Sequence, residues 1–242
     1  MLFRSTLPYF SRELGALSCL PDLSEAATRA RSAKAAALLA RLDSLDAARL
    51  PREIATTVEV ARLRTRQWSR EAHWYWLVFD PMGVGFYTLF APTAYCGGFL
   101  FSCLNPVLTG FRFDSDGDAD RYLGLVSDYG RLVRQLHART TGQASRGIRL
   151  PKAQLEPAAQ LLRGLKKSAR ASLTPAIARF RLLSDQSLQA RVSERIAAEV
   201  EPAFDAFIAE LSDPRYQQSA PDSVGMRSEE HTSELQSQNR IS

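Results

Sequence analysis

Histidine side chains can ligate zinc or act as general bases, and this chain has three histidines. A zinc site of the His-Glu-x-x-His type needs two imidazoles on one helical face, with a glutamate beside them as the base. His73 and His137 each lack a second histidine four residues later, and His231 lies in the C-terminal run considered below. His73, beside Trp74 and Trp76, is expected to pack or to lie at an interface. The sequence therefore predicts no metal ligands in this chain.

A run of aspartates could hold calcium if its spacing matched an EF-hand loop. The run from Asp114 to Asp120 begins like such a loop, which needs glycine at its sixth position and a bidentate acid at its twelfth. Those two positions are Ala119 and Leu125. Carboxylates also favour the first turn of a helix, where the helix dipole is positive. We therefore interpret the run as the start of a helix.

Glycine-rich stretches could cradle phosphates or present a nucleophile, but none here has the required pattern. The stretch Gly142–Gly147 is one residue too long for a nucleophile elbow, and no predicted strand precedes it. Gly83-Val84-Gly85 lacks the third glycine and the strand–helix context of a dinucleotide-binding turn. The sequence therefore predicts no catalytic and no cofactor-binding residues.

The chain is basic, with a formal net charge of +5, yet its charge pattern is ordinary for a folded protein. Only four of the 31 basic residues are lysines, and the arginines are interleaved with Asp and Glu. We therefore expect no nucleic-acid partner, which would need a clustered basic face. One helix face is basic, and we interpret it as solvated while leaving contact with an anion or a partner open. It comprises Arg163, Lys166, Lys167 and Arg170.

The cysteines and the N-terminus leave the compartment undecided. Cys19, Cys96 and Cys103 are odd in number and form no Cys-x-x-Cys motif, which argues against a disulfide framework. The apolar run within the first twenty residues is interrupted by Arg12 and Glu13, so it makes no convincing signal peptide. The cytoplasm and the periplasm both stay open.

The elements that would position these side chains are helical. Ser24 suits the N-cap of an alanine-rich helix whose leucines recur between Leu38 and Leu45. Pro51 suits the first turn of a second helix, running from about Arg52 into the region of residues 68–79. A short connection of this kind predicts two antiparallel neighbours.

The clearest helix carries apolar residues at i, i+4, i+7, i+11 and i+14. They are Tyr122, Val126, Tyr129, Val133 and Leu136. A loop is predicted over Thr140–Gly147, and Pro151 introduces a further helix that reaches about Arg170. The last helix is expected to open at Ser184, and Pro202 should kink or split it. Its apolar positions are Leu188, Val192, Ile196, Val200, Phe204, Phe207 and Leu211.

The segment Pro81–Phe111 carries no charge for 31 residues, which makes it long enough to cross a membrane. Prolines and a glycine pair divide it into short pieces, so no apolar helix of about 20 residues fits between them. We expect a buried, partly irregular segment rather than a membrane span.

Several short motifs, taken in order, resemble the N-terminal half of a bacterial family catalogued as domain of unknown function eight-eight-five. The resemblance covers roughly residues 22–226, and its order and spacing carry it more than any one motif. The matching stretches are Leu38–Asp43, Tyr122-Leu123 with Leu125, Gly147–Lys152, Val200–Phe204 and Ser223–Gly225.

This resemblance implies a function for a longer protein. Members of the family are all-helical and are expected to be carboxypeptidase-like zinc peptidases whose His-Glu-x-x-His helix lies well downstream of this region. The resemblance thus implies zinc and a peptide substrate for the full-length protein, and no catalytic residue here. In related helical peptidases this portion forms a wall of a long cleft, which would make Trp74–Phe111 a substrate-facing or interdomain surface.

The C-terminal run Arg227–Ser242 resembles a translated sequencing adapter, and such segments are excluded from fold reasoning. We therefore divide the chain into a poorly defined segment 1–21, a helical portion 22–226 and an artefactual tail 227–242. The expected fold is all-α, an antiparallel helical array whose domain is truncated before its missing C-terminal half. The expected function is the inactive N-terminal part of a zinc-dependent peptidase, with a non-enzymatic helical protein-interaction module as the alternative.

Overall fold

The computed structural model describes residues 19–77, 99–113, 115, 117–175 and 187–222. Every regular element in these residues is helical, which confirms the all-α fold. The elements are α1 (Glu25–Asp43), the 3-10 turn η3 (Ala47–Arg49), α2 (Arg52–Ser69), α3 (Phe99–Thr109), α4 (Gly117–Ala144), α5 (Lys152–Leu173), α6 (Leu188–Arg195), the π turn η5 (Ile196–Val200), α7 (Glu201–Ser212) and α8 (Pro214–Ser219).

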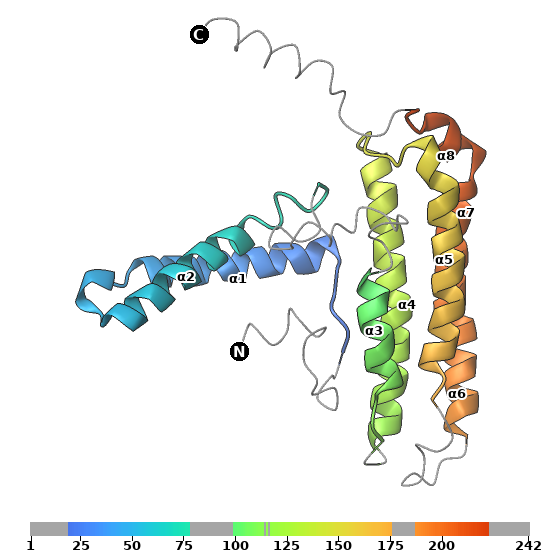
Figure 1. Cartoon of the computed structure of the whole chain (residues 1–242), viewed down its shortest axis with the longest axis horizontal. Helices are drawn as coiled ribbons and strands as arrows, with labels where there is room; N and C mark the ends of the chain where they lie inside the picture. Colours follow the sequence, from blue (N-terminus) through green and yellow to red (C-terminus); the bar gives the residue numbers. More distant parts are fainter. Residues whose placement is uncertain (1–18, 78–98, 114, 116, 176–186, 223–242) are drawn as a thin grey trace, which may run out of the picture.

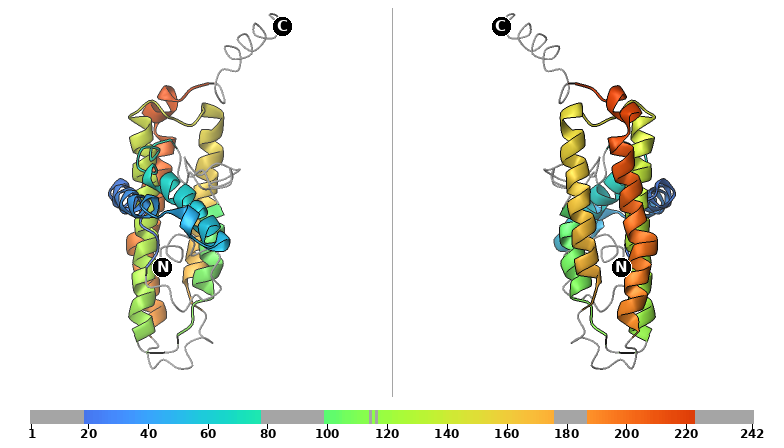
Figure 2. Two further views of the ribbon diagram at one scale, coloured as in Figure 1. Left: turned by 90° about the vertical axis from the view of Figure 1, so that its left-hand side faces the viewer. Right: turned by 90° about the vertical axis from the view of Figure 1, so that its right-hand side faces the viewer.

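The helices form two parts (Figure 1). Helices α3, α4 and α5 and the continuous stretch α6–η5–α7 stand side by side as an upright bundle in which consecutive members run in opposite directions, and α8 lies at its top. Within the bundle, α3 packs on α5, while α4 packs on the continuous stretch α6–η5–α7. The α1–α2 hairpin projects from the side of the bundle in Figure 1, and Figure 2 looks along the hairpin, in front of the bundle on the left and behind it on the right.

Side-chain hydrogen bonds cap the start of the hairpin at α1 and hold its far end, where α1 meets α2. Ser24 Oγ accepts a hydrogen bond from Ala27 N at 3.1 Å, which confirms the predicted N-cap of α1. At the far end, the Arg62 guanidinium of α2 donates to the carbonyls of Leu42 and Leu45 at 2.8 and 2.7 Å. The two helices pack on each other as predicted. Their buried residues are small: Thr28, Ser32, Ala35, Val58 and Thr65.

Helix α4 is the central element of the bundle, and the predicted apolar stripe from Tyr122 to Leu136 is buried along its whole length. The predicted loop over Thr140–Gly147 is wrong, because α4 continues to Ala144. The threonine hydroxyl of Thr140 bonds back to the carbonyl of Leu136 at 3.1 Å, which keeps it inside the helix. The chain turns only at Gly147, whose φ of 78° favours glycine.

Pro202 interrupts the last helix as predicted. A proline has no N–H for the carbonyl four residues earlier, and its ring crowds that carbonyl. The chain accommodates this by widening into the π turn η5, which separates α6 from α7. All seven predicted apolar positions of this stretch are buried. The predicted opening at Ser184 lies outside the described residues.

Aromatic rings join the helices of the bundle, and their hydroxyls are satisfied. Phe101 of α3 lies 5.4 Å from the Tyr129 ring of α4 and 5.8 Å from Phe204 of α7. The Tyr129 hydroxyl donates to Asn105 Oδ1 at 3.0 Å, and burial raises the pKa of this phenol. Tyr122 likewise donates to the carbonyl of Leu173 at 2.7 Å. These rings tie three helices into one core.

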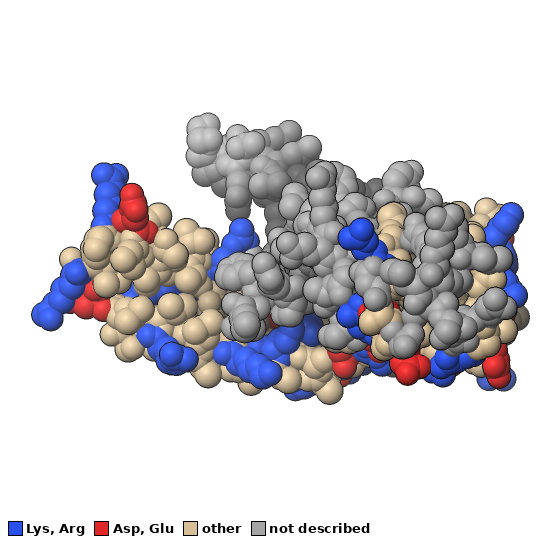
Figure 3. All heavy atoms as spheres, turned by 90° about the horizontal axis from the view of Figure 1, so that it is seen from below, with Lys and Arg blue, Asp and Glu red and all other residues tan. Residues whose placement is uncertain are grey.

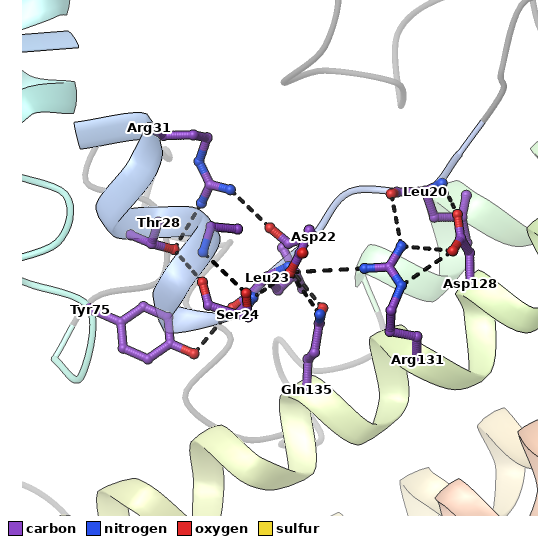
Figure 4. Close-up of polar contacts among 11 residues, drawn as sticks. Leu20, Asp22, Leu23, Ser24, Thr28, Arg31, Tyr75, Asp128, Arg131 and Gln135 are labelled. Atoms are coloured by element: carbon purple, nitrogen blue, oxygen red, sulfur yellow. Dashed lines mark hydrogen bonds and ion pairs between the residues drawn. The ribbon is translucent and has the colours of Figure 1, made fainter. Parts of the chain in front are cut away.

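The chain reaches the hairpin through a strap, residues 19–24, that runs along α4 (Figure 4). Leu20 N donates to Asp128 Oδ2 at 2.8 Å, and Leu23 N donates to Gln135 Oε1 at 2.8 Å. Both leucine side chains are buried in the core. The strap is therefore held by its backbone and by two apolar anchors.

The same face of α4 holds the segment that returns from the hairpin. The Arg139 guanidinium donates to the carbonyl of Tyr75 and lies 4.3 Å above its ring, and Gln143 Nε2 donates to the carbonyl of Trp76 at 2.8 Å. Tyr75 in turn donates its hydroxyl to the carbonyl of Leu23 at 3.1 Å. We call the gripping side chains the α4 row: Asp128, Arg131, Gln135, Arg139 and Gln143.

Part of the uncharged segment Pro81–Phe111 is described, and it is buried as expected. α3 contains Pro106, and the side chains of Phe101 and Leu104 are fully buried. Among the described residues, no helix combines the length and apolarity that crossing a membrane requires. The rest of that segment, the pair Gly83–Gly85 and the tail 227–242 lie outside the description.

Candidate functional site

An open groove runs between α4 and the η5–α7 stretch, and we call it the α4–α7 groove. Its volume is about 700 Å³, within the range of ligand-binding clefts. The π turn helps to form it, because η5 supplies part of one wall. Its lining comprises Arg134, His137, Ala138, Thr141, Gly142, Ser145, Ala198, Glu199, Pro202, Ala203 and Ala206.

The groove combines a floor of small residues with a polar rim. Ala138 and Gly142 lie one turn apart on α4, and Ala198, Pro202 and Ala206 lie one turn apart on the opposite wall. Ala138, Ala198 and Ala206 are exposed. Small side chains at Ala138 and along the opposite wall leave room for a chain to approach the helix backbones closely, whereas the Trp76 ring occupies the space beside Gly142.

Glu210 organises the polar end of the groove. Its Oε2 is hydrogen-bonded to Nε2 of His137 and accepts a hydrogen bond from Thr141 Oγ1 at 2.7 Å. The imidazole stacks on Phe207, with ring centroids 5.1 Å apart and planes 18° apart. The His137 and Glu210 side chains are both about one quarter exposed, at 23% and 22%. A carboxylate and an aromatic face thus fix the orientation of an imidazole that water can reach.

This arrangement can hold a hydrogen-bonding ligand, and it places one hydroxyl beside a carboxylate. A general base must lie within hydrogen-bond reach of the hydroxyl it activates. The Thr141 hydroxyl meets this condition, because it lies 2.7 Å from Glu210 Oε2; the carbonyl oxygen of His137, at 3.1 Å, is the alternative acceptor for its single hydrogen. The Ser145 hydroxyl donates to the carbonyl of Gly142.

A cation lies at the other end of the rim. Arg134 is exposed and donates from Nη1 to the backbone oxygen of Glu199 at 3.1 Å, which joins α4 to η5. Ligand carboxylates or carbonyls are the groups that such a guanidinium binds well.

The residues present do not fit a zinc site. Zinc in proteins takes three or four nitrogen, sulfur or carboxylate ligands. Within the described ranges, no three His, Cys, Asp or Glu side chains come together to hold a metal ion. The Nε2 atom of His137 is committed to Glu210. His73 is exposed and contacts the Trp74 ring edge-on at 4.7 Å, and its predicted alternative place at an interface stays a prediction.

The described aspartates of the Asp114–Asp120 run serve the start of α4. Asp118 Oδ2 accepts a hydrogen bond from Ser115 N at 2.7 Å and Oδ1 pairs with Arg121 at 2.7 Å. Asp120 pairs with Arg191 of α6 at 3.0 Å. These carboxylates act as local helix caps and ion-pair partners.

The basic face of α5 is largely neutralised by ion pairs. Lys166 pairs with Asp205 of α7 at 2.7 Å, and Arg170 pairs with Glu201. Arg163 pairs with Glu156 on its own helix at 3.1 Å. Two of these pairs therefore bridge α5 and α7.

Sequence reasoning missed two functional candidates because their partners are distant in the chain. Glu210 meets His137 across 73 residues, and Arg139 meets Tyr75 across 64. Burial lowers the pKa of the Arg139 guanidinium to about 10, partly offset by Tyr75 and Glu71.

No curated protein and no solved structure matches this chain. The family described as Bacterial protein of unknown function (DUF885) matches residues 8–234, a wider range than residues 22–226, which resembled it by motif. That match covers most of the chain, so this protein belongs to the DUF885 family of bacterial proteins.

Proposed function

We propose that this chain is the helical, substrate-holding portion of a peptidase-type protein and that its α4–α7 groove binds a peptide. Zinc and the catalytic glutamate would come from elsewhere in a longer protein, and this portion would be inactive alone. The observation that carries the proposal is the groove itself, with its floor of small residues and its hydrogen-bonding rim.

The chemistry of the rim supports a peptide as the ligand. A peptide presents N–H donors and carbonyl acceptors at regular intervals, and it gains affinity where these meet fixed partners. Arg134 can donate to a carbonyl or a terminal carboxylate, and the His137–Glu210 pair adds a donor or acceptor slightly less than one turn further along α4. The alanine floor favours peptides with small side chains.

The first test measures binding of a fluorescein-labelled alanine-rich peptide of about ten residues to the full chain by fluorescence anisotropy. Ala198→Trp fills the groove from an exposed position, and we expect it to weaken binding by about tenfold or more. Ala197→Trp is the matched control, since Ala197 is also exposed on η5 but does not line the groove. Equal binding by both variants, or no saturable binding by the wild type, would overturn the proposal.

The peptidase part of the proposal has a separate test. Sequencing the native locus past the codon for Met226 should reveal a continuing frame with a His-Glu-x-x-His motif and a downstream glutamate. A stop codon within a few tens of residues would remove the enzyme and leave a peptide-binding protein.

A non-enzymatic interaction module is the second candidate, and one observation favours it. The α1–α2 hairpin projects from the bundle and carries the most exposed large aliphatic side chains, Val60 at 54% and Leu63 at 53%. Isolated exposed aliphatic residues are common, but here both lie on one face of a projecting helix.

A further inference from the structure

The outward face of α2 carries a continuous row of exposed residues, which we call the outer stripe. Its members are spaced at i, i+4, i+8, i+11, i+14 and i+18, so they share one side of the helix. The opposite side carries Val58 and Thr65, which are buried within the hairpin. The outer stripe comprises Arg52, Thr56, Val60, Leu63, Arg66 and Arg70, all of them exposed.

The outer stripe has an apolar centre and basic ends. Val60 and Leu63 lie in its middle. Arg52 lies at one end, and Arg66 and Arg70 lie at the other. None of these three arginines forms an ion pair with a described residue. Arg62, on the inward side, contrasts with them, because it pairs with Asp43 and Glu59 and bonds to the end of α1.

The charge around the outer stripe is predominantly positive. Two exposed acids of α2, Glu53 and Glu59, flank the outer stripe, against its three arginines, and Glu59 is engaged by Arg62. Figure 3 shows one face of the hairpin, where Lys and Arg side chains are spread along its length and acidic side chains are fewer. A binding partner for this surface must therefore supply negative charge.

We propose that the outer stripe docks an amphipathic helix of a partner protein, apolar along its centre and acidic at its flanks. Arg52 to Arg70 spans about 27 Å along the helix, which matches a partner helix of about five turns. An apolar strip on such a helix would cover Val60 and Leu63, and its carboxylates would meet the arginines.

The apolar centre is what selects a protein over the other anionic partners. Nucleic acid is recognised through phosphate contacts, to which a pair of aliphatic side chains contributes nothing. A membrane-binding helix buries a broad apolar face, whereas the outer stripe offers only two aliphatic side chains. This surface is separate from the α4–α7 groove, so the inference goes beyond the peptide-binding proposal, and it rests on the interaction-module candidate, whose partner it specifies.

The test uses the full chain and a labelled synthetic peptide of about 20 residues, with leucines on one helical face and glutamates on its flanks. We expect saturable binding that weakens with added salt. Val60→Ser with Leu63→Ser should weaken it by about tenfold or more. Arg52→Glu, Arg66→Glu and Arg70→Glu together should shift the preference to the same peptide with lysines in place of glutamates.

The matched control replaces an exposed aliphatic pair that lies off the outer stripe. Leu45 and Ile54 are 43% and 51% exposed, so Leu45→Ser with Ile54→Ser removes a similar apolar area from the same hairpin. Peptide binding should be unchanged by this control, with all variants keeping the wild-type circular dichroism spectrum. Ala198→Trp should also leave it unchanged, which separates this surface from the groove.

Two results would overturn the proposal. One is peptide binding that the control pair weakens as much as the Val60 and Leu63 changes do. The other is tighter binding of an oligouridylate or of phosphatidylserine vesicles that depends on Arg52, Arg66 and Arg70 but not on Val60 and Leu63. That second result would assign the arginines to a nucleic acid or a lipid surface.

Discussion

At Gly130, α4 approaches the π turn so closely that a methyl group would not fit. An ideal Cβ at this position would lie 2.6 Å from the backbone oxygen of Glu199 and 3.0 Å from its carbonyl carbon. A backbone atom cannot rotate aside as a side chain can. Gly124, on the same helix, has no heavy atom within 4 Å of an added Cβ.

These two glycines make a matched pair for a stability measurement. Gly130→Ala is expected to lower the free energy of unfolding by about 1–3 kcal/mol, because it overpacks the contact with η5. Gly124→Ala is expected to raise it by up to about 1 kcal/mol, because alanine is the better helix former. Urea denaturation measures both, and equal changes would contradict the close approach.

Asp22 of the strap is the residue where pH should act most directly. Partial burial tends to raise the pKa of Asp22, but hydrogen bonds from Ser24 and Gln135 and the charge of Arg131 outweigh it. The pKa is thereby held below its ordinary value of 3.8. Half of the side chain is exposed, so solvent screens these interactions.

Asp22→Asn should therefore be less stable than the wild type near neutral pH, by a modest amount. A lowered folded-state pKa means that the ionised carboxylate stabilises the fold above the unfolded-state pKa, about 4. This contribution is lost as the pH falls through the folded-state pKa. Thermal denaturation across a pH series should show the two proteins converging in acid, and a gap that widens in acid would refute the assignment.

Among the elements, the hairpin depends on one side chain at its far end. Arg62 donates to the carbonyls of Leu42, in the last turn of α1, and Leu45, just beyond it, and the Leu42 carbonyl also accepts from Leu45 N at 3.1 Å. The Arg62 side chain is only 15% exposed, and it also pairs with Asp43 and Glu59. The small residues between α1 and α2 add little apolar burial, so this cap carries much of the order of the hairpin end.

Arg62→Ala is expected to increase amide hydrogen exchange at the C-terminal end of α1 and the start of α2. Exchange within α4 should stay unchanged, because α4 is held by the bundle core. Arg66→Ala is the matched control, since Arg66 lies on the same helix but is exposed and pairs with no described residue. Faster exchange in α4 as well would show that the hairpin and the bundle are not independent.

The sequence allows prediction of helices that bury a periodic apolar stripe. It does not allow prediction of helix ends and side-chain pairs that depend on contacts between residues distant in the chain. The α4 stripe and the break at Pro202 follow from local rules. The end of α4 does not follow from local rules. The helix continues through Gly142, where the Trp76 ring packs into the space that a side chain would fill. An added Cβ there would lie 2.3 Å from the Trp76 ring. The His137–Glu210 pair could not be predicted from the sequence either, because no local pattern shows that α4 and α7 are neighbours.

For the whole molecule, tryptophan fluorescence and far-ultraviolet circular dichroism report on different parts of the structure. All three tryptophans, Trp68, Trp74 and Trp76, lie at the base of the hairpin or in the turns that follow it. Far-ultraviolet circular dichroism instead reports helix from both parts, most of it from the bundle. Tryptophan fluorescence therefore reports the junction alone.

Heating should separate these two signals. We expect the fluorescence transition at a lower temperature than the circular dichroism transition, because the hairpin is held by backbone contacts and small buried residues while the bundle has an aromatic core. Coincident transitions would mean that the hairpin and the bundle unfold as one cooperative unit.

The α4 row has a consequence for how this protein can change during evolution. Its side chains bind main-chain atoms of Leu20, Leu23, Tyr75 and Trp76, and every amino acid except proline presents the same N–H and carbonyl groups. Leu20 and Leu23 are therefore constrained by their core packing alone, whereas Asp22, Ser24 and Tyr75 also bond through their side chains. Drift among apolar residues in homologous chains should accumulate at Leu20 and Leu23, while substitutions in the α4 row must be compensated or lost.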